Sequence, residues 1–76
     1  MTYLNLMIPG QKGKVVGFAR DSKLVRRLYE LGIQTGRAIV YLRNAPFNDP
    51  LEVMVGSSCL TLRHAEAALI AVELEA

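Results

Sequence analysis

Single glycines and prolines divide this chain into short segments, and this spacing limits the structures that it can form. Proline cannot donate a hydrogen bond to a β-ladder, and glycine readily adopts the left-handed backbone that tight turns need. The segments between them are rich in β-branched and other apolar residues, as is typical of strands. We therefore expect a mainly β fold of short strands joined by turns. We place strands at residues 4–8, 14–20, 37–44, 51–56, 59–63 and 70–74.

The second half of the chain shows the strand pattern most clearly. In residues 51–56 an apolar side chain occupies every second position, and residues 59–63 repeat this alternation after a turn at residues 56–58. Alternate residues of a strand share one face, so this face is expected in the core. Residues 14–20 carry apolar side chains on both faces, and their pattern does not decide which face is buried. The expected core face of the later strands holds Leu51, Val53, Val55, Leu60 and Leu62.

One segment, residues 23–31, has helical spacing. Side-chain oxygens at residues 21–22 can cap its first turn, because they accept hydrogen bonds from otherwise unpaired amides. Gly32 stands where a helix commonly ends in a left-handed residue, and Ile33 is expected to pack back onto Leu28. A helix this short is stable only when it is docked on other elements. Its predicted core face consists of Leu24, Leu28 and Leu31.

Val25 and Tyr29 form a second apolar stripe beside this core face, at about 100° per residue. Two interpretations of the stripe stay open. It covers the rim of the sheet or the loop at residues 45–50 with Phe47, or it contacts a partner protein. A tyrosine flanked by arginine is typical of interface hot spots, so we predict a contact centred on this helix.

The length and charge of the chain narrow its functional classes. Its 76 residues suffice for one domain, which we place at residues 1–76. The net charge of +2 comes from scattered residues, so no nucleic-acid partner is predicted. Cys59 is the only cysteine, and no apolar run approaches the roughly 20 residues that span a bilayer. We predict a cytoplasmic protein without membrane insertion, and a weak homo-oligomer stays open.

Candidate chemistry is sparse. No pattern places a base beside a nucleophile, so an enzyme is not predicted. Gly10 and Gly13 lack the lysine and hydroxyl residue of a phosphate-binding loop. Cys59, His64 and Glu66 can be imagined as ligands of ferrous iron in a metal chaperone, but adjacent positions on a turn and a strand do not obviously converge. We therefore predict no cofactor and no metal site.

Several motifs in order resemble the FeoA family. Residues 4–10 read Leu-x-x-Met-x-Pro-Gly, and residues 26–33 read Arg-Arg-Leu-x-Glu-Leu-Gly-Ile. Residues 45–50 resemble the Ala-Pro-Leu-Gly-Asp-Pro loop of that family, and residues 62–67 its Leu-Arg-x-x-Glu-Ala segment. Thr35 stands where the family usually has proline. The resemblance covers nearly the whole chain.

The resemblance implies a fold and a partner. The fold would be a five-stranded SH3-like barrel with one short α-helix after the first strand and a short helical turn, at residues 64–68, before the last strand. The function would be that of a non-enzymatic accessory protein that binds the cytoplasmic GTP-binding domain of the FeoB-type ferrous-iron permease and modulates its assembly or activity. The alternative is an iron-responsive, transcription-related module that resembles the C-terminal domain of iron-dependent repressors.

The predicted contact surface combines the helix with two later segments. Arg26 supplies a charge beside Tyr29, as the rims of interfaces often do. Arg26, Arg27 and Arg63 can form a basic patch, and a solvated helix face also explains the first two. The predicted partner-binding residues are Val25, Arg26, Tyr29, Asp49, Pro50 and Arg63.

Overall fold

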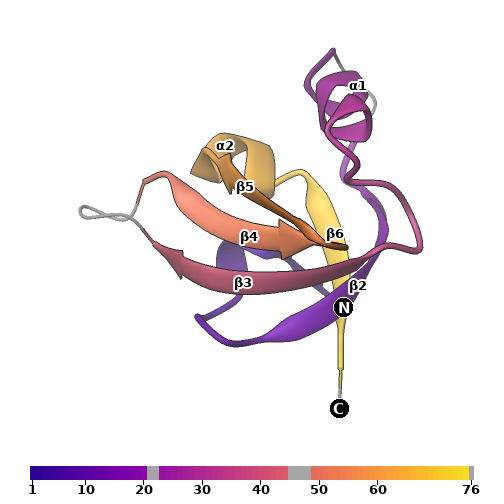
Figure 1. Cartoon of the computed structure of the whole chain (residues 1–76). Helices are drawn as coiled ribbons and strands as arrows, with labels where there is room; N and C mark the ends of the chain where they lie inside the picture. The colour runs from indigo at the N-terminus through magenta and orange to yellow at the C-terminus, as the bar shows by residue number, and fades with distance from the viewer. Residues whose placement is uncertain (21–22, 45–48, 76) are drawn as a thin grey trace.

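The computed structural model describes residues 1–20, 23–44 and 49–75. The expected helix cap at residues 21–22, and Phe47 in the 45–50 loop, lie outside the described residues. Within these ranges the chain is mainly β, with short helices (Figure 1). The elements are β1 (Thr2–Tyr3), the 3-10 helix η1 (Leu4–Leu6), β2 (Lys12–Phe18), α1 (Lys23–Glu30), β3 (Ala38–Asn44), β4 (Leu51–Val55), β5 (Ser58–Leu62), α2 (His64–Ala67) and β6 (Ile70–Leu74).

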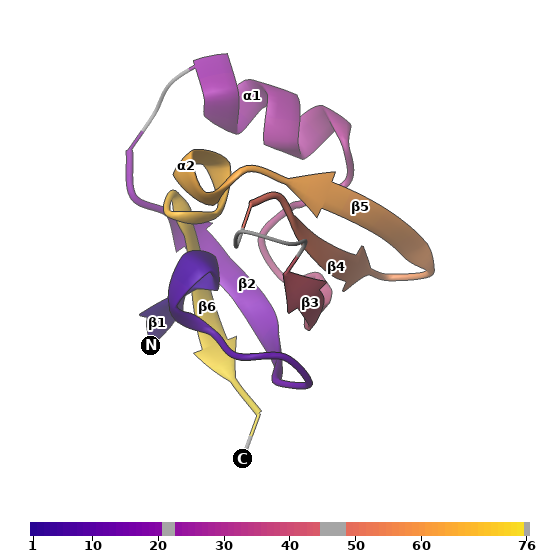
Figure 2. The same cartoon turned by 90° about the vertical axis from the view of Figure 1, so that its left-hand side faces the viewer.

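The strands form one antiparallel sheet in the order β1-β6-β2-β3-β4-β5. The strand count of five that the family resemblance implied is therefore wrong, because the described residues contain six strands. The edge strands β1 and β5 are not paired with each other in this part of the chain, so the sheet is curled but not closed (Figure 2). Both α-helices lie at the end of the molecule opposite the C-terminal end of β6 (Figures 1 and 2). No helix in the described ranges is long and apolar enough to cross a membrane.

The N-terminal segment departs from the strand predicted at residues 4–8. Leu4 begins η1, and the Met7 N–H donates to the Leu4 carbonyl over 3.2 Å. A 3-10 helix has three residues per turn, so Leu4 and Met7 share one side, and both are buried. Leu6 and Ile8, which a strand would align with Leu4, are exposed instead. The added edge strand β1 also means that α1 follows the second strand, β2, rather than the first.

The later hairpin confirms the predicted alternation. Leu51, Val53 and Val55 of β4 are buried, and the residues between them are half-buried. In β5 Leu62 is buried and Leu60 packs partly buried against the core. The predicted helical turn before the last strand is present as α2.

Strand β2 carries apolar residues on both faces, and its pairing with β6 is irregular. Its register with β6 shifts between Val15 and Gly17, which is a β-bulge. Val15 is fully buried, and Val16 points into solvent. The largest fully buried side chains of the described residues are Leu4, Val15, Leu28, Ile33, Ile39, Tyr41, Leu51, Val53, Leu62, Ile70 and Val72.

Gly13 allows β2 and β6 to approach closely. A Cβ built at this residue would lie 2.5 Å from the Glu73 carbonyl oxygen and 2.5 Å from Cγ1 of Val72. Real Cβ atoms do not approach a backbone oxygen this closely. Glycine at this position is therefore a packing requirement of the sheet rather than a turn signal.

The core face of α1 differs from the prediction. Leu28 is fully buried as expected, but Leu24 and Leu31 are each 39% exposed. Val25, assigned to the outer stripe, is buried in their place. The apolar residues of this segment cover an arc of roughly 160° at about 100° per residue. So wide a stripe fits more than one docking angle, and the helix is docked on its Val25 and Leu28 side.

The end of α1 follows the prediction. Gly32 has a φ of +98°, in the left-handed region. Its N–H donates to the Tyr29 carbonyl over 3.0 Å, and the Ile33 N–H donates to the Leu28 carbonyl over 3.0 Å. These two bonds form a Schellman motif. Ile33 is fully buried in the same cluster as Leu28, so it fills the place that was expected for Leu31.

Candidate partner-binding site

A groove of about 480 Å³ lies between α1, α2 and the end of β5. Figure 2 shows α1 above α2 and β5 at this end of the molecule. Pro50 and Arg63, two of the predicted site residues, line the groove, whereas the described helix residues predicted as contacts do not. The lining consists of Leu24, Arg27, Pro50, Thr61, Leu62, Arg63, Ala65 and Glu66.

Glu66 joins the two helices at the floor of this groove. Its side chain is buried, yet both carboxylate oxygens are paired. Oε1 accepts from the Arg63 N–H over 3.0 Å, and Oε2 accepts from Nη1 of Arg27 over 2.9 Å. A buried carboxylate is tolerated only with such partners. Arg27 is therefore not simply part of a solvated helix face, since it ties α1 to α2.

Asp49 holds the start of α2 from the other side. Its Oδ1 accepts from the His64 N–H over 3.0 Å, and its Oδ2 lies 3.4 Å from Nη1 of Arg63. The first turn of a helix has unpaired N–H groups, and Asp49 satisfies one of them. The structure therefore brings Asp49 and Arg63 together, and Pro50 and Arg63 line the groove.

Tyr29 lies away from the groove. Its ring packs on Phe18 with centroids 5.3 Å apart and an interplanar angle of 47°, and its hydroxyl lies 3.5 Å from Oγ1 of Thr35. Tyr29 follows Leu24 by five positions, which places the two side chains roughly 140° apart around α1. The helix therefore has two exposed apolar flanks, and only the Leu24 flank borders the groove.

Two predicted contact residues on α1 have contrasting positions. Val25 is only 9% exposed, so its side chain packs inside the chain and cannot form the outer stripe that was expected. Arg26 is exposed and has no ion pair within residues 1–20, 23–44 and 49–75. Sequence reasoning missed Leu24 as a surface residue because its spacing with Leu28 marked it as core. The pair of Arg27 and Glu66 was also missed, because they are far apart in the sequence.

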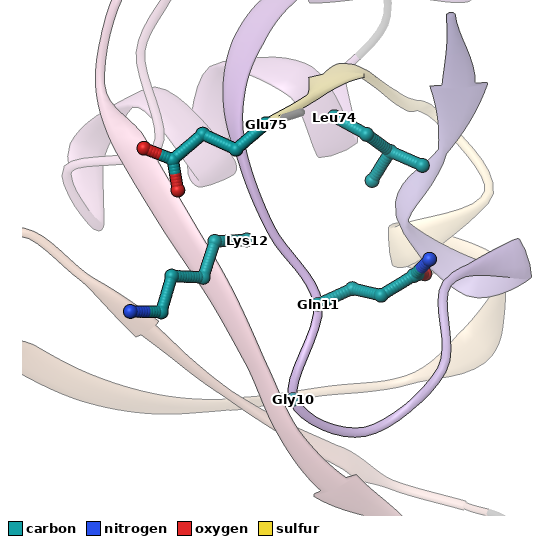
Figure 3. A pocket seen from close by; sticks show the side chains of 5 residues that line it. All are labelled: Gly10, Gln11, Lys12, Leu74 and Glu75. Carbon is teal, nitrogen blue, oxygen red and sulfur yellow. The ribbon is translucent and has the colours of Figure 1, made fainter.

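A second hollow lies at the opposite end of the molecule (Figure 3). It measures about 250 Å³ and is lined by Gly10, Gln11, Lys12, Leu74 and Glu75. Figure 3 shows that these side chains do not converge: Gln11 and Leu74 lie on one side of the strand, and Lys12 and Glu75 on the other. The side-chain oxygen of Gln11 is already used, since it accepts from the Ile8 N–H over 2.9 Å. This hollow therefore lacks a set of side chains aimed at one point.

The imagined iron ligands are not brought together. Cys59 is exposed on β5, while Glu66 is engaged by Arg27 and Arg63. Nε2 of His64 is buried without a hydrogen-bond partner among the described residues. In the described part of the chain no group of three or more histidine, cysteine or acidic residues is arranged to hold a metal ion.

The family model and several solved structures that match this chain all belong to one family, FeoA. The model of the FeoA domain matches residues 2–74. The FeoA-like protein of Clostridium acetobutylicum has a TM-score of 0.90 at 34% identity, covering 96% of this chain and 85% of its own. FeoA of Chlorobium tepidum has a TM-score of 0.89 at 35% identity, covering 99% of this chain and 71% of its own. Against iron(II) transport protein A of Clostridium thermocellum, at 30% identity, this chain spans only 45% of the length. No curated protein matches the sequence.

Two further solved structures resemble this chain, an FeoA protein solved with zinc and a manganese regulator. FeoA of Stenotrophomonas maltophilia, solved with zinc and described as a prokaryotic SH3 domain protein, has a TM-score of 0.82 at 26% identity over 96% of this chain and 91% of its own. The manganese regulator SloR has a TM-score of 0.83 at 15% identity, covering 97% of this chain and 34% of its own. At that identity the likeness to a regulator shows a common fold alone.

Proposed function

Because the chain belongs to the FeoA family of the ferrous-iron transport system, we propose that it is a non-enzymatic accessory protein that binds the cytoplasmic part of a FeoB-type permease. Binding would modulate the assembly or the activity of the permease. A protein without chemistry of its own can do this only by binding one state of its partner more tightly than another. The proposed fold is the SH3-like one, with the sheet described above in place of a closed five-stranded barrel.

The observation that carries this proposal is the groove between α1, α2 and β5. It is bordered by the exposed Leu24 and by two arginines whose side chains are 64% and 68% exposed, Arg27 and Arg63. Apolar surface beside exposed arginine is typical of protein interfaces.

Two titratable groups among the described residues have shifted pKa values, and each shift has a structural cause outside the groove. Catalytic groups often have strongly perturbed pKa values. The pKa of Tyr41 is raised by burial in the core, and the pKa of Arg43 is raised by its bond to Glu52. Both groups lie outside the groove.

Calorimetric titration with the purified cytoplasmic part of the permease tests the proposal. We expect saturable binding to the parent protein and at least about tenfold weaker binding to Leu24→Ser, because interface anchors contribute about 1–2 kcal/mol or more. Leu74→Ser is the matched control, since Leu74 has the same 39% exposure at the far end of the molecule. Absence of binding to the parent protein, or equal effects of the two changes, would contradict the proposal.

A further inference from the structure

The hydrogen-bonding edge of β5 is open at the groove. The Gly56 N–H donates to the Ala38 carbonyl in β3, so the alternate residues of β4, beginning with Val55, direct their backbone groups toward β5. These residues lie opposite Ser58, Leu60 and Leu62. The intervening residues of β5, Cys59 and Thr61, therefore direct their N–H and C=O groups away from β4.

No strand follows β5 in the sheet formed by residues 1–20, 23–44 and 49–75. An edge of this kind can pair with another extended segment, and proteins usually protect it with charges, proline or a covering element. The side chains of β5 are neutral, and none is proline. Thr61 lines the groove beneath α1, so this edge opens into the space bordered by Leu24 and Arg27.

The free charge around this edge is positive. The two carboxylates at the groove, Glu66 and Asp49, already accept two hydrogen bonds each. Arg27 and Arg63 each use one donor in these pairs, and a guanidinium has five. At the other end of β5, Nη1 of Arg37 lies 3.6 Å from the position of a Cβ at Gly56. An acidic segment along β5 would thus meet arginine at both ends.

We propose that an extended segment of the permease, carrying an aliphatic and an acidic side chain, adds to β5 as an additional strand. Its backbone pairs with Cys59 and Thr61. Its aliphatic side chain enters the groove beside Leu24, and its carboxylate binds Arg63. Main-chain pairing supplies affinity in this mode, and the groove selects the side chains. This inference rests on the proposed function, because it identifies the surface and the type of segment through which the partner is bound.

Substitution by proline at the outward position tests the backbone pairing directly. Thr61→Pro removes an N–H that does not pair with β4, and edge strands tolerate proline at such positions. Thr61→Val keeps the N–H and nearly the same shape. With the cytoplasmic part of the permease as the probe, we expect Thr61→Pro to bind about tenfold more weakly than Thr61→Val, because the two variants differ in the outward N–H. Circular dichroism and thermal melting establish that both variants are folded.

Amide hydrogen exchange in the folded parent protein gives a second readout that does not depend on any variant. The amides of Cys59 and Thr61 should exchange freely in the isolated chain and become protected when the permease fragment is added. Binding of overlapping peptides from that fragment should locate the segment. The parent protein should prefer the acidic peptides, and Arg63→Glu should abolish this preference. Binding of the fragment without protection of these two amides would overturn this inference and leave the proposed function standing.

Other occupants of the edge give different results. If a second copy of this chain pairs with β5, the amides of Cys59 and Thr61 become protected as the protein concentration rises, and sedimentation shows dimers. That result would mean that the permease segment is not the occupant of the edge. If the fragment does not bind the parent protein at all, the proposed function fails and this inference fails with it.

Discussion

Strand β2 and helix α1 are attached to the rest of the molecule in different ways. Gly13 of β2 brings the backbone of this strand against β6, with no room for a Cβ. Helix α1 is attached by the side chains of Val25 and Leu28 and by the bond between Arg27 and Glu66. Its two flanks stay exposed. The close backbone contact at Gly13 tolerates no larger side chain. The attachment of α1 through a few side chains leaves part of the helix surface free to contact a partner.

The largest expected effect lies on the β2 side. Gly13→Ala should lower the free energy of unfolding by about 3 kcal/mol, because the new methyl group meets a backbone oxygen that cannot move aside. Gly17→Ala in the same strand is the control, since a Cβ there meets nothing within 4 Å. Urea denaturation measures both. Equal stabilities of the two variants would refute the role of close backbone packing.

A smaller effect is expected where α1 meets α2. Glu66→Ala should cost about 2 kcal/mol, because it leaves the Arg63 N–H without its acceptor and Arg27 without its partner. Hydrogen exchange should then become faster in α1 than in β2. The exposed Glu30 on α1 provides the control, and Glu30→Ala should change stability by less than about 0.5 kcal/mol. Uniform loosening of the whole sheet would show that Glu66 is not a local tether.

The outer flank of α1 should matter less for partner binding than the groove flank. Tyr29→Ala removes a ring that packs on Phe18 at the surface, and we expect the affinity for the permease fragment to fall by about 1 kcal/mol. Titration calorimetry compares it with Leu24→Ser. A larger loss with Tyr29→Ala would move the contact to the Phe18 side of the helix.

The smallest expected effect is on the pH dependence of stability, through Tyr41 in the core strand β3. Burial raises the pKa of Tyr41 above its usual value of 10.0, so the folded state holds the phenolic proton more tightly than the unfolded state. Stability is then unaffected below pH 10 and falls as the pH rises above it toward the folded pKa. The loss should be smaller in Tyr41→Phe, as urea denaturation on either side of pH 10 can measure. An identical pH dependence in the two proteins would argue against this cause.

An operator-binding assay addresses the likeness to metal-dependent regulators. We expect no binding to DNA at low or moderate salt, because the net charge is only +2 and the basic residues are scattered along the chain. Affinity that falls steeply as salt is raised would favour the transcription-related alternative.

Local patterns predicted much of the β structure and the end of the helix. Alternation in β4 and β5 identified the buried face, because neighbouring residues of a strand point to opposite sides. Gly32 and Ile33 ended α1 as expected, since the Schellman motif depends on adjacent residues. The strand predicted at residues 4–8 was wrong, because Leu4 and Met7 fit the core by a turn of 3-10 helix.

What the sequence by itself determined was the family, the mainly β architecture and the faces of the later strands, since these depend on order and periodicity along the chain. The tertiary structure decided which side of α1 is buried and which residues form the groove. Arg27 and Glu66 are separated by 39 residues, and their pairing depends on how the two helices meet. The apolar stripe of α1 is wide enough for several docking angles, so only packing against the sheet selects one.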